Sequence, residues 1–175
     1  MNISNIDKNH YLKLRKNISD FIRQISEIDD VNLNVLDIAP EIHKGAKEFF
    51  HKAIVKTLDI NPNSKADYIV DICNNNQNII PDNFFDVVIC TEVLEHTNNP
   101  FLAVKELYRI IKPNGILAAS TPFNFRIHNP LPDNWRFTEY GLKILMSKFK
   151  SVQINELKDE NRFLMPIQYT ILAKK

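Results

Sequence analysis

One apolar run, with polar residues directly behind it, constrains the fold of this chain more than any other feature. The run is Val87–Cys90, and most of its side chains are β-branched. Such a run predicts a strand buried on both faces, which in soluble proteins means the middle of a parallel sheet covered by helices. The polar residues that follow it are Thr91, Glu92, Glu95 and His96. Because ligands of open α/β sheets bind at the carboxyl ends of the strands, we expect chemistry here; the alternative is that Glu92 and Glu95 begin a solvated helix.

Length and composition narrow the class of protein. The chain has 175 residues, 44% of them hydrophobic, which is enough for one full core, so we expect one domain over 1–175, with an N-terminal helix in 1–30 and an α/β core in 31–175. The net charge is +1, so no overall field attracts nucleic acid, and we expect no nucleic-acid partner. The sequence has no signal peptide and no apolar run of the about 18 residues that span a membrane, so we expect a cytoplasmic protein without a membrane span. Cys73 and Cys90 belong to no cluster with metal-ligand spacing, so no metal is expected.

Periodicity predicts alternating helices and strands. Apolar residues at three- and four-residue steps predict an amphipathic helix over about Asn9–Ile28, packed at the edge of the domain. Further helices are expected at Lys44–Lys52 and at Thr138–Phe149. Another is expected to begin at Pro100, with Asn99 as its N-cap. Strands are expected at Asn32–Ile38, Ala53–Ile60, Ala66–Ile72, Val87–Cys90, Ile116–Thr121, Val152–Leu157 and Ile167–Ala173.

This alternation predicts an α/β fold with a doubly wound, mostly parallel sheet of about seven strands and helices on both faces. The last two strands are separated only by a short polar segment, so we expect an antiparallel hairpin. Each of the first three predicted strands has an aspartate as its next-to-last residue, and these are Asp37, Asp59 and Asp71.

Several motifs occur in a fixed order along the chain. They are Val35-Leu36-Asp37-Ile38, Leu58-Asp59-Ile60, Val70-Asp71-Ile72, the block Phe85–His96, the block Glu106–Gly115, and Thr121-Pro122-Phe123. In this order they resemble class I S-adenosylmethionine-dependent methyltransferases, in the small type 11-like subgroup often found with surface-polysaccharide or glycan genes. The resemblance covers about Val35 to Phe149, and the block Asn134–Leu142 is similar to the segment before the subgroup's last helix.

The resemblance implies S-adenosyl-L-methionine as cofactor and methyl transfer to a small-molecule or glycan acceptor. It implies that Asp59 accepts hydrogen bonds from the ribose hydroxyls, that Asp71 and the Ile72 backbone meet the adenine, and that Asp37 organises the loop around the methionine ammonium group. The other residues implied for the cofactor are Ala39, Glu41, Ile60, Thr91 and Glu92.

Methyl transfer to a hydroxyl needs a base or a desolvated pocket. His96 and His128 lie near predicted strand ends and are the candidate catalytic residues, with helix capping or packing as the alternative. Arg126, Trp135 and Arg136 are the candidate acceptor-binding residues, on or just after a loop, Pro122–Trp135, that we expect to act as a lid. The alternative is that Trp135 seals the core and Arg136 pairs with Asp133.

The chain departs from the family's pattern after the first strand, where Gly-x-Gly is usual. It has Ala39-Pro40-Glu41 there, and its first glycine is Gly45. Two other functions therefore stay open. One is a methyltransferase-like partner subunit with weak or lost cofactor binding. The other is an NAD-dependent sugar-modifying enzyme, although such enzymes need a glycine-rich turn to bind a pyrophosphate.

We predict that Glu41→Gly tightens the binding of S-adenosylmethionine, because it removes a carboxylate from the region where the resemblance places the cofactor's own carboxylate. Calorimetry at two salt concentrations measures this, and the gain should shrink at high salt if the charges are solvated. Equal affinities of the variant and the parent at both concentrations would mean that Glu41 points away from the cofactor.

Overall fold

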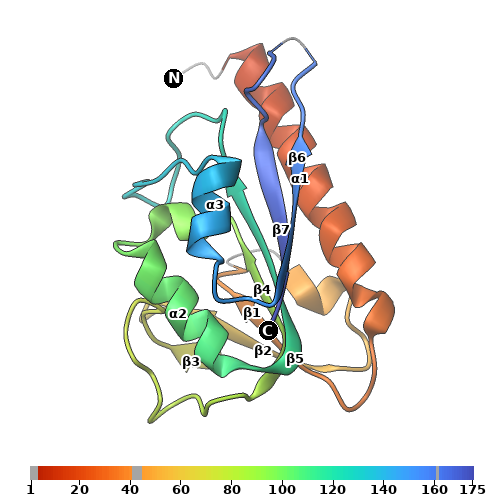
Figure 1. Ribbon diagram of the computed structural model, residues 1–175, viewed down its shortest axis with the longest axis vertical. Helices are drawn as coiled ribbons and strands as arrows, with labels where there is room; N and C mark the ends of the chain where they lie inside the picture. Colours follow the sequence, from red (N-terminus) through yellow and green to blue (C-terminus); the bar gives the residue numbers. More distant parts are fainter. Residues whose placement is uncertain (1–3, 41–44, 161) are drawn as a thin grey trace.

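The computed structural model describes residues 4–40, 45–160 and 162–175, and its centre is a seven-stranded sheet in the order β3-β2-β1-β4-β5-β7-β6 (Figure 1). The strands are β1 (Asn34–Ile38), β2 (Ile54–Asp59), β3 (Tyr68–Ile69), β4 (Phe85–Thr91), β5 (Ile111–Pro122), β6 (Ser151–Leu157) and β7 (Gln168–Lys174). The helices are α1 (Asn5–Ile25), α2 (Pro100–Ile110) and α3 (Glu139–Leu145), with short 3-10 turns η1 (Ser26–Ile28), η2 (Gly45–Glu48) and η3 (Leu94–His96). No helix in these described stretches is both long and apolar enough for a membrane span.

The strand directions confirm the predicted mixed sheet. Strands β1 to β5 pair in parallel, whereas β7 is antiparallel to both β5 and β6. The predicted terminal hairpin is therefore present, and β4 occupies the middle of the sheet as expected.

Both faces of the central strands are buried, because alternate side chains enter two different cores. Val88 and Cys90 of β4 pack in a cluster with residues of α2 and α3, whereas Val87 and Ile89 pack in a second cluster with residues of α1. Helices thus cover both faces, as predicted. The prediction that the N-terminal helix packs at the edge was wrong, since α1 lies over a sheet face and contacts β5 and β7 (Figure 1).

Two capping predictions are confirmed. The side chain of Asn99 accepts hydrogen bonds from the N–H groups of Phe101 and Leu102, and Pro100 stands at the first helical position of α2. The hydroxyl of Thr138 likewise accepts from the N–H of Gly141 at the start of α3.

Other predicted elements differ from the structure. Within the predicted helix Lys44–Lys52, the described residues form only the 3-10 turn η2, and the predicted third strand is reduced to two residues in β3. The fifth strand begins earlier than predicted, because the chain is already extended at Ile111, which pairs with Phe85; after Pro113–Gly115 the regular pairing resumes at Ile116. The pattern Pro-Asn-Gly therefore marks an irregularity inside a strand.

The chain after β1 is shaped by two residues in the left-handed region. Ala39 has φ of +49° and Gly45 has φ of +55°. Oδ2 of Asp37 accepts a hydrogen bond of 2.6 Å from the N–H of Ala46, which draws the chain back onto the end of β1. Gly45 is required for this close approach, since a Cβ there would lie 2.1 Å from Oδ2 of Asp37.

We predict that Gly45→Ala lowers the free energy of unfolding by about 2 kcal/mol or more, because the left-handed conformation alone costs a residue with a Cβ about 1–2 kcal/mol and the clash adds to it. The matched control is Gly141→Ala in α3, where the nearest atom would be 3.6 Å away and the change should be neutral or stabilising by up to about 1 kcal/mol. Chemical denaturation of both variants measures the difference, and equal midpoints would contradict the role assigned to Gly45.

Candidate active site

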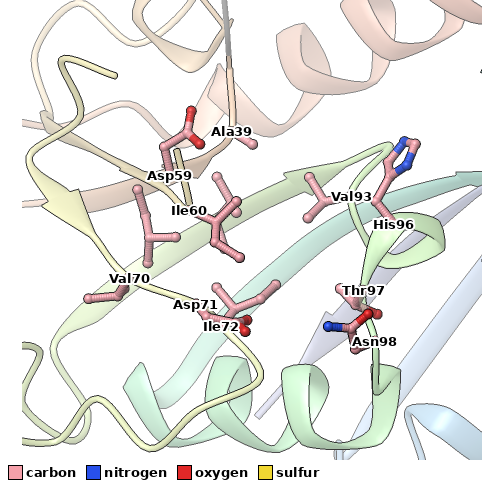
Figure 2. A pocket seen from close by; sticks show the side chains of 12 residues that line it. Ala39, Asp59, Ile60, Val70, Asp71, Ile72, Val93, His96, Thr97 and Asn98 are labelled. Carbon is pink, nitrogen blue, oxygen red and sulfur yellow. The ribbon is translucent and has the colours of Figure 1, made fainter. Parts of the chain in front are cut away.

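A cavity opens at the carboxyl ends of β1, β2 and β3 and faces the turn after β4 (Figure 2). We call it the smaller cavity, and its lining residues are Ile38, Ala39, Leu58, Asp59, Ile60, Val70, Asp71, Ile72, Val93, His96, Thr97 and Asn98. Its volume, counted with the open space at its mouth, is about 480 Å³. The structure thus brings five of the residues predicted to bind the cofactor together with the candidate catalytic residue His96; the five are Ala39, Asp59, Ile60, Asp71 and Ile72.

Asp59 and Asp71 are held in place by the chain that follows them. Oδ1 of Asp59 accepts a hydrogen bond of 2.8 Å from the N–H of Asn61, and Oδ1 of Asp71 accepts one of 2.7 Å from the N–H of Cys73. Each bond uses one carboxylate oxygen and orients the other. Both side chains are half-buried and line the smaller cavity from opposite sides (Figure 2).

A second, larger cavity continues from the first. Its lining includes Asp37, Ala39 and Gly45 after β1, Thr91 and Glu92 after β4, His128, Asn129 and Pro130 from the loop after β5, and Tyr11, Leu14, Arg15 and Ile18 from α1. The two cavities share five lining residues, Ala39, Asp59, Ile60, Val93 and His96. Sequence analysis missed the contribution of α1, because periodicity shows which residues are apolar but not which opening they border.

Asp37 is almost fully buried at the end of β1 and borders the larger cavity. Burial raises the pKa of its carboxyl group to about 6, although the hydrogen bond from Ala46 and the nearby Lys47 oppose the rise. Glu41, which sequence analysis placed in the cofactor site, lies outside the described residues.

Glu92 ties the ends of three strands together. It has φ of +55°, and its Oε1 accepts hydrogen bonds from the Ser120 hydroxyl at 2.7 Å and from the Gln168 side chain at 2.8 Å. Burial raises the pKa of the Glu92 carboxyl group, and the two hydrogen bonds oppose that rise. The interpretation of Glu92 as part of a solvated helix was therefore wrong, since it is a partnered group with strained backbone at a cavity wall.

Glu95 is the most unusual polar residue of the described chain. It is fully buried, and among the described residues neither of its carboxylate oxygens has a hydrogen-bond donor. Burial raises the pKa of the Glu95 carboxyl group well above its usual range, and the negative charges of Glu92 and Asp133 add to the rise. The interpretation of Glu95 as part of a solvated helix was therefore also wrong. The sequence did hold one indication of a role for Glu95 in the site, because it lies between Glu92 and His96, just after the central strand.

His96 and His128 meet although 32 positions separate them in the chain. Their ring centroids are 4.9 Å apart, with the ring planes at 70°. Both border the larger cavity, and His96 also borders the smaller one. Burial lowers the pKa of His128, opposed by the charge of Asp133.

The three predicted acceptor-binding residues are engaged elsewhere. Arg136 forms a bidentate ion pair with Asp133, which confirms the alternative interpretation of that residue. Trp135 donates from Nε1 to the Thr97 carbonyl at 2.8 Å and remains 40% exposed, so it does not seal the core. Nη1 of Arg126 lies 3.9 Å from the Asp7 carboxylate of α1. None of the three is among the described residues that line the two cavities.

Comparison with known proteins agrees with this architecture. A search of curated protein sequences finds no match. Among solved structures, the chain is similar to an S-adenosylmethionine-dependent methyltransferase from Archaeoglobus fulgidus, with 20% identity, a TM-score of 0.70, and coverage of 92% of this chain and 94% of that one. It is also similar to an S-adenosylmethionine-dependent methyltransferase from Thermotoga maritima, described as a possible histamine N-methyltransferase, with 15% identity, a TM-score of 0.66, and coverage of 96% and 94%. At these identities the likeness shows the fold.

The family follows from the sequence itself. The family model described as "methyltransferase domain" matches residues 9–161, a span that contains every strand-end residue of the smaller cavity. The chain therefore belongs to the methyltransferase-domain family, within the class I methyltransferases that use S-adenosylmethionine as cofactor.

Proposed function

We propose that this chain transfers a methyl group from S-adenosylmethionine to a small-molecule or glycan acceptor. The observation that carries the proposal is the junction of the two cavities. The smaller one is lined by two oriented carboxylates, and it shares five lining residues, His96 among them, with a larger one that has room for a second molecule. A group-transfer enzyme needs this arrangement, because its two substrates must meet in line.

The residues of the smaller cavity fit a nucleoside. In this proposal Asp59 accepts hydrogen bonds from two vicinal hydroxyls, and Asp71 accepts one from an exocyclic amino group beside the Ile72 backbone; the support is that all three residues line the smaller cavity. Ile38, Leu58 and Val70 provide apolar contact for the base and the sugar. When bound, S-adenosylmethionine supplies an electrophilic methyl group on a positively charged sulfur.

The turn after β1 fits the remainder of the cofactor. Ala39 adopts the left-handed conformation for which the family's glycine is suited, and it borders both cavities. The side chain of Ala39 therefore adds only one methyl group to the backbone at the position where the family usually has glycine. Asp37 reinforces this turn through its hydrogen bond to Ala46, and Thr91 and Glu92 border the same opening from β4.

The larger cavity fits an acceptor with both apolar surface and hydroxyl groups. Tyr11 and Phe125 offer aromatic faces, whereas Ser64 and Asn129 offer hydrogen-bonding groups. Sugars are bound in this way, with a ring stacked on an aromatic side chain and its hydroxyls bound by amides and hydroxyls. His96 and His128 border this cavity, and in this proposal one of them receives the proton that an acceptor hydroxyl loses.

We predict that Asp59→Ala weakens the binding of S-adenosylmethionine by about 1.5–3 kcal/mol, the contribution of hydrogen bonds to a charged group. The matched control is Asp82→Ala, because Asp82 is exposed and pairs with Arg109 away from both cavities; its affinity should equal that of the parent. Calorimetry with S-adenosylmethionine and separately with NAD tests the alternatives together. Binding of NAD alone would favour the nicotinamide-dependent enzyme, and binding of neither would favour the partner subunit.

We also predict that Arg136→Ala loosens the loop that carries His128 while it leaves the affinity for S-adenosylmethionine nearly unchanged. Arg136 binds Asp133 and donates to the Arg126 carbonyl at 3.2 Å, so its loss frees both sides of the loop. Amide exchange across residues 123–133 should become faster. Arg126→Ala is the control, since its only described ion pair is the long one to Asp7, and equal exchange in the two variants would contradict the positioning role of Arg136.

A further inference from the structure

Three side chains with metal-binding atoms converge where the turn after β4 meets the loop after β5. They are Glu95, His96 and His128, and one ligand atom from each lies within 4.8 Å of the others. Oε1 of Glu95 lies 3.7 Å from Nε2 of His96 and 3.7 Å from Nε2 of His128. These distances exceed a hydrogen bond. They allow one ion to reach all three groups after a small inward movement, because zinc binds nitrogen and oxygen at about 2.0–2.2 Å.

Glu95 shows that something other than the described chain belongs here. Its carboxyl group is fully buried, and no donor among the described residues reaches either oxygen. A buried carboxyl group without a partner costs several kcal/mol, so native proteins pair such groups or place them on a metal. The ion pairs of Glu95 in the described chain are those with the two imidazoles.

The outward nitrogens of both imidazoles face hydrogen-bond acceptors. Nδ1 of His96 lies 3.0 Å from the Pro132 carbonyl. A carbonyl oxygen only accepts, so Nδ1 carries the hydrogen, and the lone pair of the neutral ring is on Nε2, toward Glu95. Nδ1 of His128 lies 3.0 Å from Oδ2 of Asp133, and this carboxylate favours the hydrogen on Nδ1 there too, although the contact is not aligned as a hydrogen bond.

Asp133 is fixed in place for this role. It accepts two hydrogen bonds from the Arg136 guanidinium and one of 3.1 Å from the backbone N–H of His128. An imidazole backed by a carboxylate or a carbonyl is the arrangement that orients metal-binding histidines in proteins. The Arg136 guanidinium is occupied by Asp133 and by backbone carbonyls. Three lone-pair-bearing atoms therefore face one point, and no Lys or Arg of the described residues forms an ion pair with Glu95 there.

We propose that Glu95, His96 and His128 bind a divalent first-row transition metal ion, through Nε2 of each imidazole and a carboxylate oxygen. Two imidazoles and one carboxylate suit zinc and its neighbours, whereas magnesium and calcium prefer oxygen ligands. Both histidines border the larger cavity, so an ion held by them would lie beside that cavity. The sequence-based expectation of no metal rested on the spacing of cysteines and histidines, which does not show contacts between distant loops.

The role of the ion rests on the proposed function, but its binding does not. A metal at this point would bind an acceptor oxygen and lower the pKa of its hydroxyl group, so that the hydroxyl proton passes to solvent water in the open larger cavity and the metal-bound oxygen accepts the methyl group from the sulfonium. With the ion bound, His96 and His128 serve as its ligands and do not receive the proton themselves.

The test uses the full chain without an affinity tag, freed of metal by chelation, and titrates it with Co²⁺ as a spectroscopic probe. We expect each chain to bind one Co²⁺ ion. Its visible absorption spectrum should be that of a Co²⁺ ion with nitrogen ligands and a coordination number below six, and one equivalent of Zn²⁺ should displace it. Zn²⁺ should also raise the melting temperature of the parent as its concentration increases.

Three variants assign the ligands, and one variant serves as a control. Glu95→Gln, His96→Gln and His128→Gln should each lower the affinity for Zn²⁺ by about 100-fold or more and abolish the rise in melting temperature. His51→Gln should leave both unchanged, because His51 is exposed and remote from the cluster. Circular dichroism without metal shows that each variant folds, and unchanged binding in Glu95→Gln or His128→Gln would overturn the proposal.

Calorimetry with S-adenosylmethionine separates this proposal from the proposed function. Glu95→Gln should keep the cofactor affinity of the parent, since Glu95 lines neither cavity among the described residues. A parent that binds Zn²⁺ at these three residues but does not bind S-adenosylmethionine would keep the metal site and refute methyl transfer. A parent that binds S-adenosylmethionine but no Co²⁺ or Zn²⁺ would refute the metal site alone.

Discussion

The burial of both faces of β4 and β1 is the constraint on which the other features depend. Because side chains alternate along a strand, each of these strands contributes to two cores at once and needs helices on both sides. A polar side chain within such a strand has no access to water and needs a partner from the chain. Asp37 has one in the N–H of Ala46. Other polar groups gather beyond the strand ends, and this is why the cavities and the chemistry lie at one edge of the sheet.

The turn after β1 shows that backbone conformation can be kept when the usual residue is absent. Ala39 is in the left-handed region at a cost of about 1–2 kcal/mol. The cost is sustained because the Ala39 N–H bonds the Leu58 carbonyl at 2.7 Å, and because Gly45 lets the following chain close on Asp37. Glycine is thus still required near β1, but six residues later than its usual place.

The two glutamates after β4 are buried in different ways. Glu92 is satisfied by Ser120 and Gln168, and the latter is itself bonded by Asn17 of α1. Glu95 has no such donors among the described residues and faces two imidazoles instead. Glu92 thus has two hydrogen-bond donors, whereas Glu95 has none among the described residues. The desolvation cost of burying Glu95 therefore falls at a site where a bound ligand can offset it.

The sequence by itself determined the architecture and the acidic residues of the smaller cavity. Strand positions, the mixed sheet and the caps at Asn99 and Thr138 follow from local periodicity and local hydrogen bonding, and Asp59 and Asp71 reach the cavity because Asp59 ends β2 and Asp71 follows β3 by two residues. Contacts between distant segments were decided only by the tertiary structure. The packing of α1 over a sheet face, the closure of Gly45 on Asp37 and the meeting of His96 with His128 each join loops or layers that no spacing relates. Their geometry depends on how the two cores pack, because only that packing determines where each loop crosses the edge of the sheet.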